Sequence, residues 1–124
     1  EYIAVAKAAI ILIESTALHI DMRHHTGNHP RMGAVDVCPF VPISAGTEAD
    51  CILASKIVSD HFKGSIPIYK YGLIASNQDR ASLANLRKGQ YEGLKSRVTG
   101  GEWTDESTRM PDSWSGVWGE SEER

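Results

Sequence analysis

The stretch that most constrains the fold is residues 23–43, with the sequence RHHTGNHPRMGAVDVCPFVPI. Its first half contains four residues that favour turns, Gly27, Asn28, Pro30 and Gly33. These residues prevent a helix from continuing through the segment, so His29 is expected on a turn, where reactive groups are often displayed. The ordinary pKa of histidine lies near neutral pH, which allows the side chain to accept a proton and return it.

Helices are predicted on both sides of this stretch. In residues 2–20, apolar side chains recur at spacings of three and four, at Ile3, Ala6, Ile10, Ile13 and Ala17. Ile11 and Leu12 widen this apolar face, so the first helix is expected to be largely buried. A second helix is predicted over residues 47–63, because Thr47 and Asp50 have the spacing of a capping box and Gly64 can end the helix.

Two strands are predicted between the helical segments. Residues 35–43 alternate in the manner of a strand, although Pro39 and Pro42 lack amide donors and favour an edge position. Residues 66–71 (IPIYKY) form the second candidate, followed by a short helix over residues 79–88 and another turn or two in residues 90–98. This order predicts an α/β fold, but two strands are too few for a stable sheet. Either strands are missed, or the chain is a piece of a larger sheet.

Length and charge restrict the class of protein. The 124 residues fit one domain with one core. The net charge of −3 divides into −5 for residues 102–124 and +2 for the residues before them, with no dense Lys/Arg cluster, which argues against a nucleic-acid surface. The longest apolar run, residues 8–13, is far shorter than the ~20 residues of a membrane helix and does not resemble a signal peptide.

The cysteines and histidines give no metal signature. Cys38 and Cys51 form neither a disulfide framework nor a zinc spacing, so reduced thiols in a cytosolic protein are expected. His25 and His29 have the i, i+4 spacing of helical zinc ligands, but the intervening turn formers break the helix that this spacing requires. Exposed loop histidines and no metal are therefore expected.

Four segments resemble the N-terminal subdomain of the glutamate formimidoyltransferase family, in chain order LHIDMRHHTGNH, HPRMGAVDVCPFVPI, IPIYKYG and RASLANLRKGQYEGL. The family's domain has two subdomains of ferredoxin-like topology, with the substrates between them. The resemblance implies an α/β (α+β), ferredoxin-like subdomain over residues 1–98, truncated at its N-terminus. Residues 99–124 are expected to form an acidic, tryptophan-containing tail that is a loop or partly disordered.

The resemblance also implies a reaction in cytoplasmic histidine catabolism and one-carbon metabolism. The family transfers a formimino group from N-formimino-L-glutamate to the co-substrate tetrahydrofolate without a metal. Its catalytic histidine stands in a His-Pro-Arg motif, which makes His29 the acid/base here. Arg31 could hold a substrate carboxylate, or it could form a surface ion pair with Asp36 or Asp21. Asp36 could orient a histidine, or it could belong to a solvated polar face.

The C-terminal segment departs from the family pattern. The family's folate-associated segment has a DFGP core that is missing here, although Ser113, Trp114 and Gly116 can be aligned with it as folate-binding residues. The tail tryptophans (Trp103, Trp114 and Trp118) could stack on a pterin ring or pack the tail onto the body. Two alternative functions remain: a non-catalytic binding or assembly subunit that needs a partner chain, and a metal-dependent hydrolase that uses the histidine loop.

Overall fold

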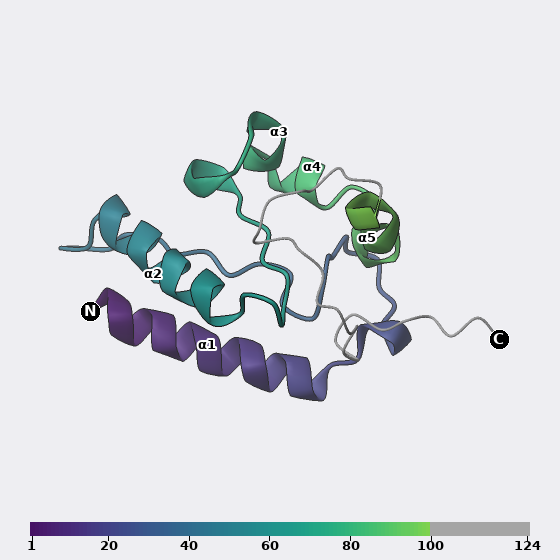
Figure 1. Ribbon diagram of the computed structural model, residues 1–124, viewed down its shortest axis with the longest axis horizontal. Helices are drawn as coiled ribbons and strands as arrows, with labels where there is room; N and C mark the ends of the chain where they lie inside the picture. Colours follow the sequence, from purple (N-terminus) through teal and green to yellow (C-terminus); the bar gives the residue numbers. More distant parts are fainter. Residues whose placement is uncertain (100–124) are drawn as a thin grey trace.

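The computed structural model describes residues 1–99 of the chain, and these residues form helices joined by turns and extended segments (Figure 1). The elements in order are α1 (Tyr2–His19), η1 (Met22–His24), α2 (Glu48–His61), η2 (Gly72–Ile74), α3 (Gln78–Ala81), α4 (Leu83–Leu86) and α5 (Gln90–Thr99). The aligned segment of Ser113, Trp114 and Gly116 and the expected tail packing lie outside the described residues, so those predictions stand as predictions.

The core lies between α1 and α2, which run side by side (Figure 1). The buried face of α1 is formed by Ala6, Ala9 and Ile13, and it packs against Ala54, Val58 and Phe62. The first helix is therefore confirmed in position. The expectation that it is largely buried is wrong, because Ile11 is 66% exposed and Leu18 is 81% exposed. No other described helix is packed along the outer side of α1 (Figure 1).

The second predicted helix and its start signal are confirmed. The Thr47 hydroxyl accepts a hydrogen bond from the Asp50 amide (3.2 Å), and the Asp50 carboxylate accepts one from the Thr47 amide (3.0 Å). This capping box satisfies amides that a helix start otherwise leaves without partners. Gly64 follows the helix with a φ of 82°, a left-handed conformation that favours glycine.

The predicted strands and the α/β, ferredoxin-like class are wrong for the residues that the structure describes, which contain helices and no strand. Residues 35–43 and 66–71 are extended in character, but no backbone hydrogen bond joins one segment to the other. A strand requires a partner ladder. Pro39, Pro42 and Pro67 remove amide donors from these two segments, and no third described segment supplies the missing pairing.

The C-terminal third of the described chain forms a second, smaller cluster. The single helix predicted over residues 79–88 is divided at Ser82, whose hydroxyl accepts a hydrogen bond from the Asn85 amide and starts α4. The further turns predicted after Gly89 are confirmed as α5. Met32, Leu86 and Leu94 are buried together, so the histidine-rich loop is packed against α4 and α5.

Candidate functional site

Arg31 is the last residue of the histidine loop, which comprises residues 24–31. Although charged, the residue is only 8% exposed. Its Nε donates to Nδ1 of His25 (3.1 Å), and Nη2 donates to the His25 carbonyl (3.0 Å). Its remaining donors reach the side chains of Gln90 (3.1 Å) and Glu92 (2.8 and 3.0 Å) on α5. All five guanidinium N–H groups therefore have an acceptor.

The partner of Arg31 differs from the partners expected from the sequence. A surface ion pair with Asp36 or Asp21 was one expectation, and it is wrong because Glu92 is the carboxylate that Arg31 contacts. In this arrangement no guanidinium donor remains for a substrate carboxylate, so substrate binding by Arg31 would require Glu92 or Gln90 to move. Spacing alone could not reveal this pairing, because Glu92 follows Arg31 by 61 residues.

The loop is fastened to the start of α5 by backbone as well as by side chains. The Tyr91 amide donates to the Arg31 carbonyl (2.9 Å). The hydrogen bonds from Arg31 lower the pKa of the Glu92 carboxyl, and the same bonds raise the pKa of the Arg31 guanidinium. Both groups are therefore held in their charged forms at neutral pH. Their contact holds the C-terminal end of the histidine loop in place.

His29 lies on the exposed part of this braced loop. Its Nδ1 is 2.8 Å from the carbonyl oxygen of Pro30. Because a carbonyl can only accept a hydrogen bond, Nδ1 must carry the proton, and in the neutral ring Nε2 then bears a lone pair. Among the described residues Nε2 makes no hydrogen bond. This geometry is compatible with two roles for His29. The ring can be a turn histidine that the backbone holds in place, or an imidazole positioned to accept a proton.

Asp36 connects Met32, the residue directly after the histidine loop, to Arg87 at the C-terminal end of α4. Its Oδ1 accepts a hydrogen bond from the Met32 amide (2.9 Å), and its Oδ2 is paired with Arg87. The side chains of Asp36 and Arg87 are 20% and 19% exposed. Both carboxylate oxygens are thus engaged by groups other than histidine, so neither the histidine-orienting role nor the solvated polar face describes this residue.

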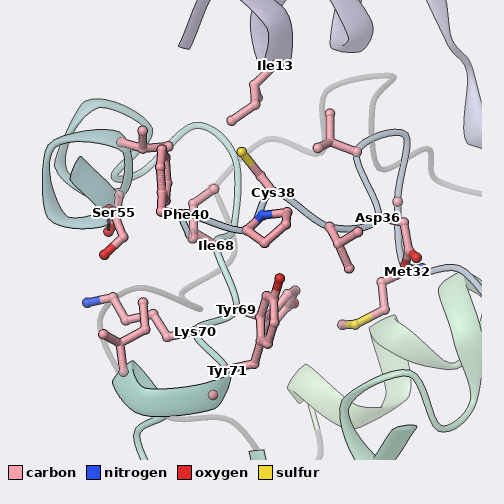
Figure 2. A pocket seen from close by; sticks show the side chains of 18 of the residues that line it. Ile13, Met32, Asp36, Cys38, Phe40, Ser55, Ile68, Tyr69, Lys70 and Tyr71 are labelled. Atoms are coloured by element: carbon pink, nitrogen blue, oxygen red, sulfur yellow. Dashed lines mark hydrogen bonds between the residues drawn. The ribbon is translucent and has the colours of Figure 1, made fainter. Parts of the chain in front are cut away.

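A cavity of about 310 Å³ lies beside the loop, which sequence reasoning did not foresee. It is bordered by α1, α2 and the two extended segments, and its lining is largely apolar (Figure 2). Its polar lining residues include Asp36, Tyr69 and Tyr71, whereas His29 is not among the lining residues. The size and lining are those of small-molecule pockets. In the sequence, the cavity was indicated by the apolar residues of segments 35–43 and 66–71, because these segments have no complete sheet in which to bury them.

Cys38 lines this cavity and is half-buried. Burial raises the pKa of its thiol, so the neutral, weakly nucleophilic form is favoured. Neither cysteine forms a disulfide. Within residues 1–99 no group of three or more histidine, cysteine, aspartate or glutamate side chains is placed to hold a metal ion.

Comparison with known families decides the classification. The family model described as "Formiminotransferase domain, N-terminal subdomain" matches residues 1–119, nearly the whole chain. The chain belongs to the formiminotransferase family.

Several relatives support this membership. The chain is 41% identical over 102 residues to the glutamate formimidoyltransferase of Streptococcus pyogenes, covering 81% of this chain and 34% of the relative. It is 35% identical over 117 residues to the formimidoyltransferase-cyclodeaminase of Rattus norvegicus, covering 93% of this chain and 21% of the relative. The glutamate formimidoyltransferase of Thermoplasma acidophilum is 37% identical over 100 residues, with coverage of 77% and 33%.

The resemblance noted in the sequence is therefore confirmed at the level of the family. This formiminotransferase-family chain spans between about a fifth and a third of the length of the relatives it matches. The matched region includes the histidine loop, its clamp on α5 and the residues around the cavity.

Proposed function

We propose that this chain provides the histidine-bearing part of a glutamate formimidoyltransferase. The reaction transfers a formimino group from N-formimino-L-glutamate to N5 of tetrahydrofolate, in cytoplasmic histidine catabolism. The observation that carries the proposal is His29, whose ring is exposed and held by the Pro30 carbonyl with Nε2 unoccupied among the described residues. Membership of the formiminotransferase family supplies the reaction to which this imidazole is suited.

The chemistry requires one proton to be moved twice. N5 of tetrahydrofolate attacks the formimino carbon, and Nε2 of His29 accepts the proton that N5 loses. The tetrahedral intermediate then breaks its bond to the glutamate nitrogen, and the imidazolium returns the proton to that departing amine. Such acid/base assistance contributes roughly 10²–10⁴-fold to the rate.

The loop clamp explains how a histidine on a turn can be positioned for this role. Arg31 follows His29 by two residues and is fixed by Glu92 and by the Tyr91 amide. A catalytic group held in this way loses little orientational freedom when substrate binds. In the proposed role Arg31 supports the loop, and a contact with a substrate carboxylate would need a rearrangement of α5.

The test is the release of glutamate from N-formimino-L-glutamate in the presence of tetrahydrofolate, with His29→Ala compared against His24→Ala. His24 is the matched control because its side chain is 83% exposed and its nearest acidic partner, Asp21, is 3.9 Å away. We expect His29→Ala to lower the rate by roughly 10²–10⁴-fold and His24→Ala to leave it unchanged. Full activity in His29→Ala would contradict the proposed role.

A second candidate is a non-catalytic or incomplete subunit that needs a partner chain. The extended segments without mutual hydrogen bonds favour it. If the chain alone releases no glutamate, the segments of the S. pyogenes relative outside the match can be added as a separate polypeptide. Activity that appears only on this addition, and only with His29 intact, would establish that the chain is a subunit that needs a partner chain.

A further inference from the structure

His25 and His29 belong to the same loop, but their rings carry their protons on different nitrogens. An arginine side chain can only donate hydrogen bonds, and Nε of Arg31 lies 3.1 Å from Nδ1 of His25. Nδ1 of His25 must therefore hold a lone pair, and the proton of this neutral ring is on Nε2. In His29 the proton is on Nδ1, because that nitrogen faces the Pro30 carbonyl. The two histidines are thus held in opposite tautomers.

Arg31 closes the loop onto itself through His25. Its Nε donates to the His25 ring, and its Nη2 donates to the His25 carbonyl (3.0 Å). The other N–H groups of the same guanidinium reach Gln90 and Glu92 on α5. The two ends of segment 25–31 are therefore joined to each other and to α5, and His29 lies between them in the chain.

The Nε–H group of Arg31 depends on the His25 ring. No other group among the described residues accepts a hydrogen bond from it. Because Arg31 is only 8% exposed, water cannot readily replace a lost acceptor, and a buried donor without a partner is unfavourable. The ring also lies beside the turn that precedes His29, since a Cβ on Gly27 would stand 3.5 Å from Cε1 of His25. The ring therefore supports the loop by packing and by its hydrogen bond.

The charge state of His25 controls this closure. Protonation would convert Nδ1 from an acceptor into a donor and would place a second cation beside the guanidinium. Among the described residues, the charged groups that act on the ring are Arg31 in its own loop and Glu92 on α5. Glu92 would favour a charged ring, but both of its oxygens are bonded to Arg31, and its side chain is 63% exposed. The neutral ring is therefore the form that fits the closed loop.

We propose that His25 is a positioning residue for His29: its neutral ring binds the Nε–H group of Arg31 and keeps the loop closed. This inference rests on the proposed role of His29 and adds a second histidine that neither touches substrate nor transfers a proton. Histidines ordinarily take up a proton as the pH falls through about 6.5, so the loop opens and the rate falls in mild acid. The contact with Glu92 persists to lower pH, because the hydrogen bond from Arg31 lowers the pKa of that carboxyl.

Nuclear magnetic resonance of the full chain locates the ring protons directly and does not require activity. We expect proton–nitrogen correlation spectra at neutral pH to show Nε2 protonated in His25 and Nδ1 protonated in His29. The Arg31 Nε–H signal, identified by its absence from Arg31→Lys, should exchange slowly with water, and its exchange should become fast when His25 is protonated. A charged His25 at neutral pH, or a proton on its Nδ1 in the neutral ring, would overturn the proposal.

Two substitutions separate the acceptor from the titratable ring. His25→Leu removes the acceptor, whereas His25→Asn places an amide oxygen close to the position of Nδ1 and cannot be protonated. We expect His25→Leu to lower kcat for glutamate release by roughly tenfold or more with KM little changed, and His25→Asn to recover most of this loss. The matched control is His24→Leu, because the neighbouring His24 side chain is 83% exposed. This control should keep the wild-type rate.

The pH dependence of the rate distinguishes positioning from a merely structural role. His29 titrates in both His25→Asn and the wild type, so the ratio of their rates isolates His25. This ratio should rise several-fold as the pH falls below about 6, and identical pH profiles would overturn the proposal even if His25→Leu does not fold. Circular dichroism verifies the helical content of each variant.

The outcomes for His25 and His29 are separable. If His29→Ala is inactive while His25→Leu is folded and keeps the wild-type rate, the positioning role is overturned and the proposed function stands. If His29→Ala is fully active, the proposed function is contradicted and the positioning role falls with it. The ring protons then still decide whether the hydrogen bond between Arg31 and His25 closes the loop.

Discussion

Arg31 and Glu92, separated by 61 residues in the chain, form a two-pronged ion pair that fastens the histidine loop to α5. The two side chains are unequal in exposure, at 10% for Arg31 and 63% for Glu92. The charge of the buried Arg31 guanidinium is therefore balanced by the Glu92 carboxylate, which solvent can reach. Because His29 lies two residues before Arg31, the position of the proposed acid/base depends on this pair.

Replacing Glu92 with Gln should destabilise the fold by about 1 kcal/mol. The change removes the charge opposite a buried guanidinium, but the exposure of Glu92 lets water screen part of the loss. Urea unfolding followed by circular dichroism measures the effect. Glu1→Gln is the control, since Glu1 is exposed and caps α1 without a side-chain hydrogen bond. Equal destabilisation by both changes would show that the clamp has no special stabilising effect.

The stability gained from the clamp should disappear in acid. Arg31 holds the pKa of Glu92 below its ordinary value of 4.5, so the unfolded chain takes up the proton at a higher pH than the folded chain. The stabilisation is complete above about pH 4.5 and is lost as the pH falls through the lowered pKa. The difference in unfolding free energy between wild type and Glu92→Gln should shrink over this range. Asp21, whose pKa is about 2 because Arg23 hydrogen-bonds to it, remains charged through most of it.

A difference that stays constant from neutral pH to pH 3 would contradict this linkage. Carboxyl carbon chemical shifts provide a second measurement, because they report the titration of Glu92 separately from that of Asp21.

The Asp36–Arg87 pair should show a coupling free energy of about 1.5–3 kcal/mol in a double-mutant cycle with Asp36→Asn and Arg87→Met. The two groups are about one-fifth exposed, so each leaves a poorly solvated partner when the other is removed. The exposed Lys56–Asp60 pair on α2 is the comparison, and its coupling should be clearly smaller. A coupling no larger than that of Lys56–Asp60 would mean that the link between loop and α4 contributes little.

Local signals predicted the helices well. The apolar spacing of residues 2–20 located α1, and the Thr47–Asp50 pattern located the start of α2, because caps and helical periodicity depend on residues a few positions apart. The family was also evident from the His-Pro-Arg motif and its surroundings. The turn carrying His29 followed from its Gly, Asn and Pro residues, whose conformational preferences are local.

Features that depend on distant partners were not predictable in the same way. Alternation in residues 35–43 indicated a strand, but a strand exists only if another segment pairs with it. The partners of Arg31 and Asp36 were misjudged because Glu92 and Arg87 lie 61 and 51 residues away. The exposure of Ile11 and Leu18 was misjudged because a periodic pattern identifies an apolar face without showing whether a neighbour covers it.

Cys38 should react with iodoacetamide more slowly than a small free thiol such as N-acetylcysteine between pH 7 and 8. Burial beside the cavity raises the pKa of this thiol, so less of the reactive thiolate is present at any pH in this range. The measurement uses Cys51→Ser, which leaves Cys38 as the one cysteine of the chain, and mass spectrometry at several pH values. The rate should rise with pH without reaching a plateau by pH 8, and urea should remove the protection. Alkylation faster than the free thiol would reveal an activated cysteine and would make Cys38 a candidate nucleophile.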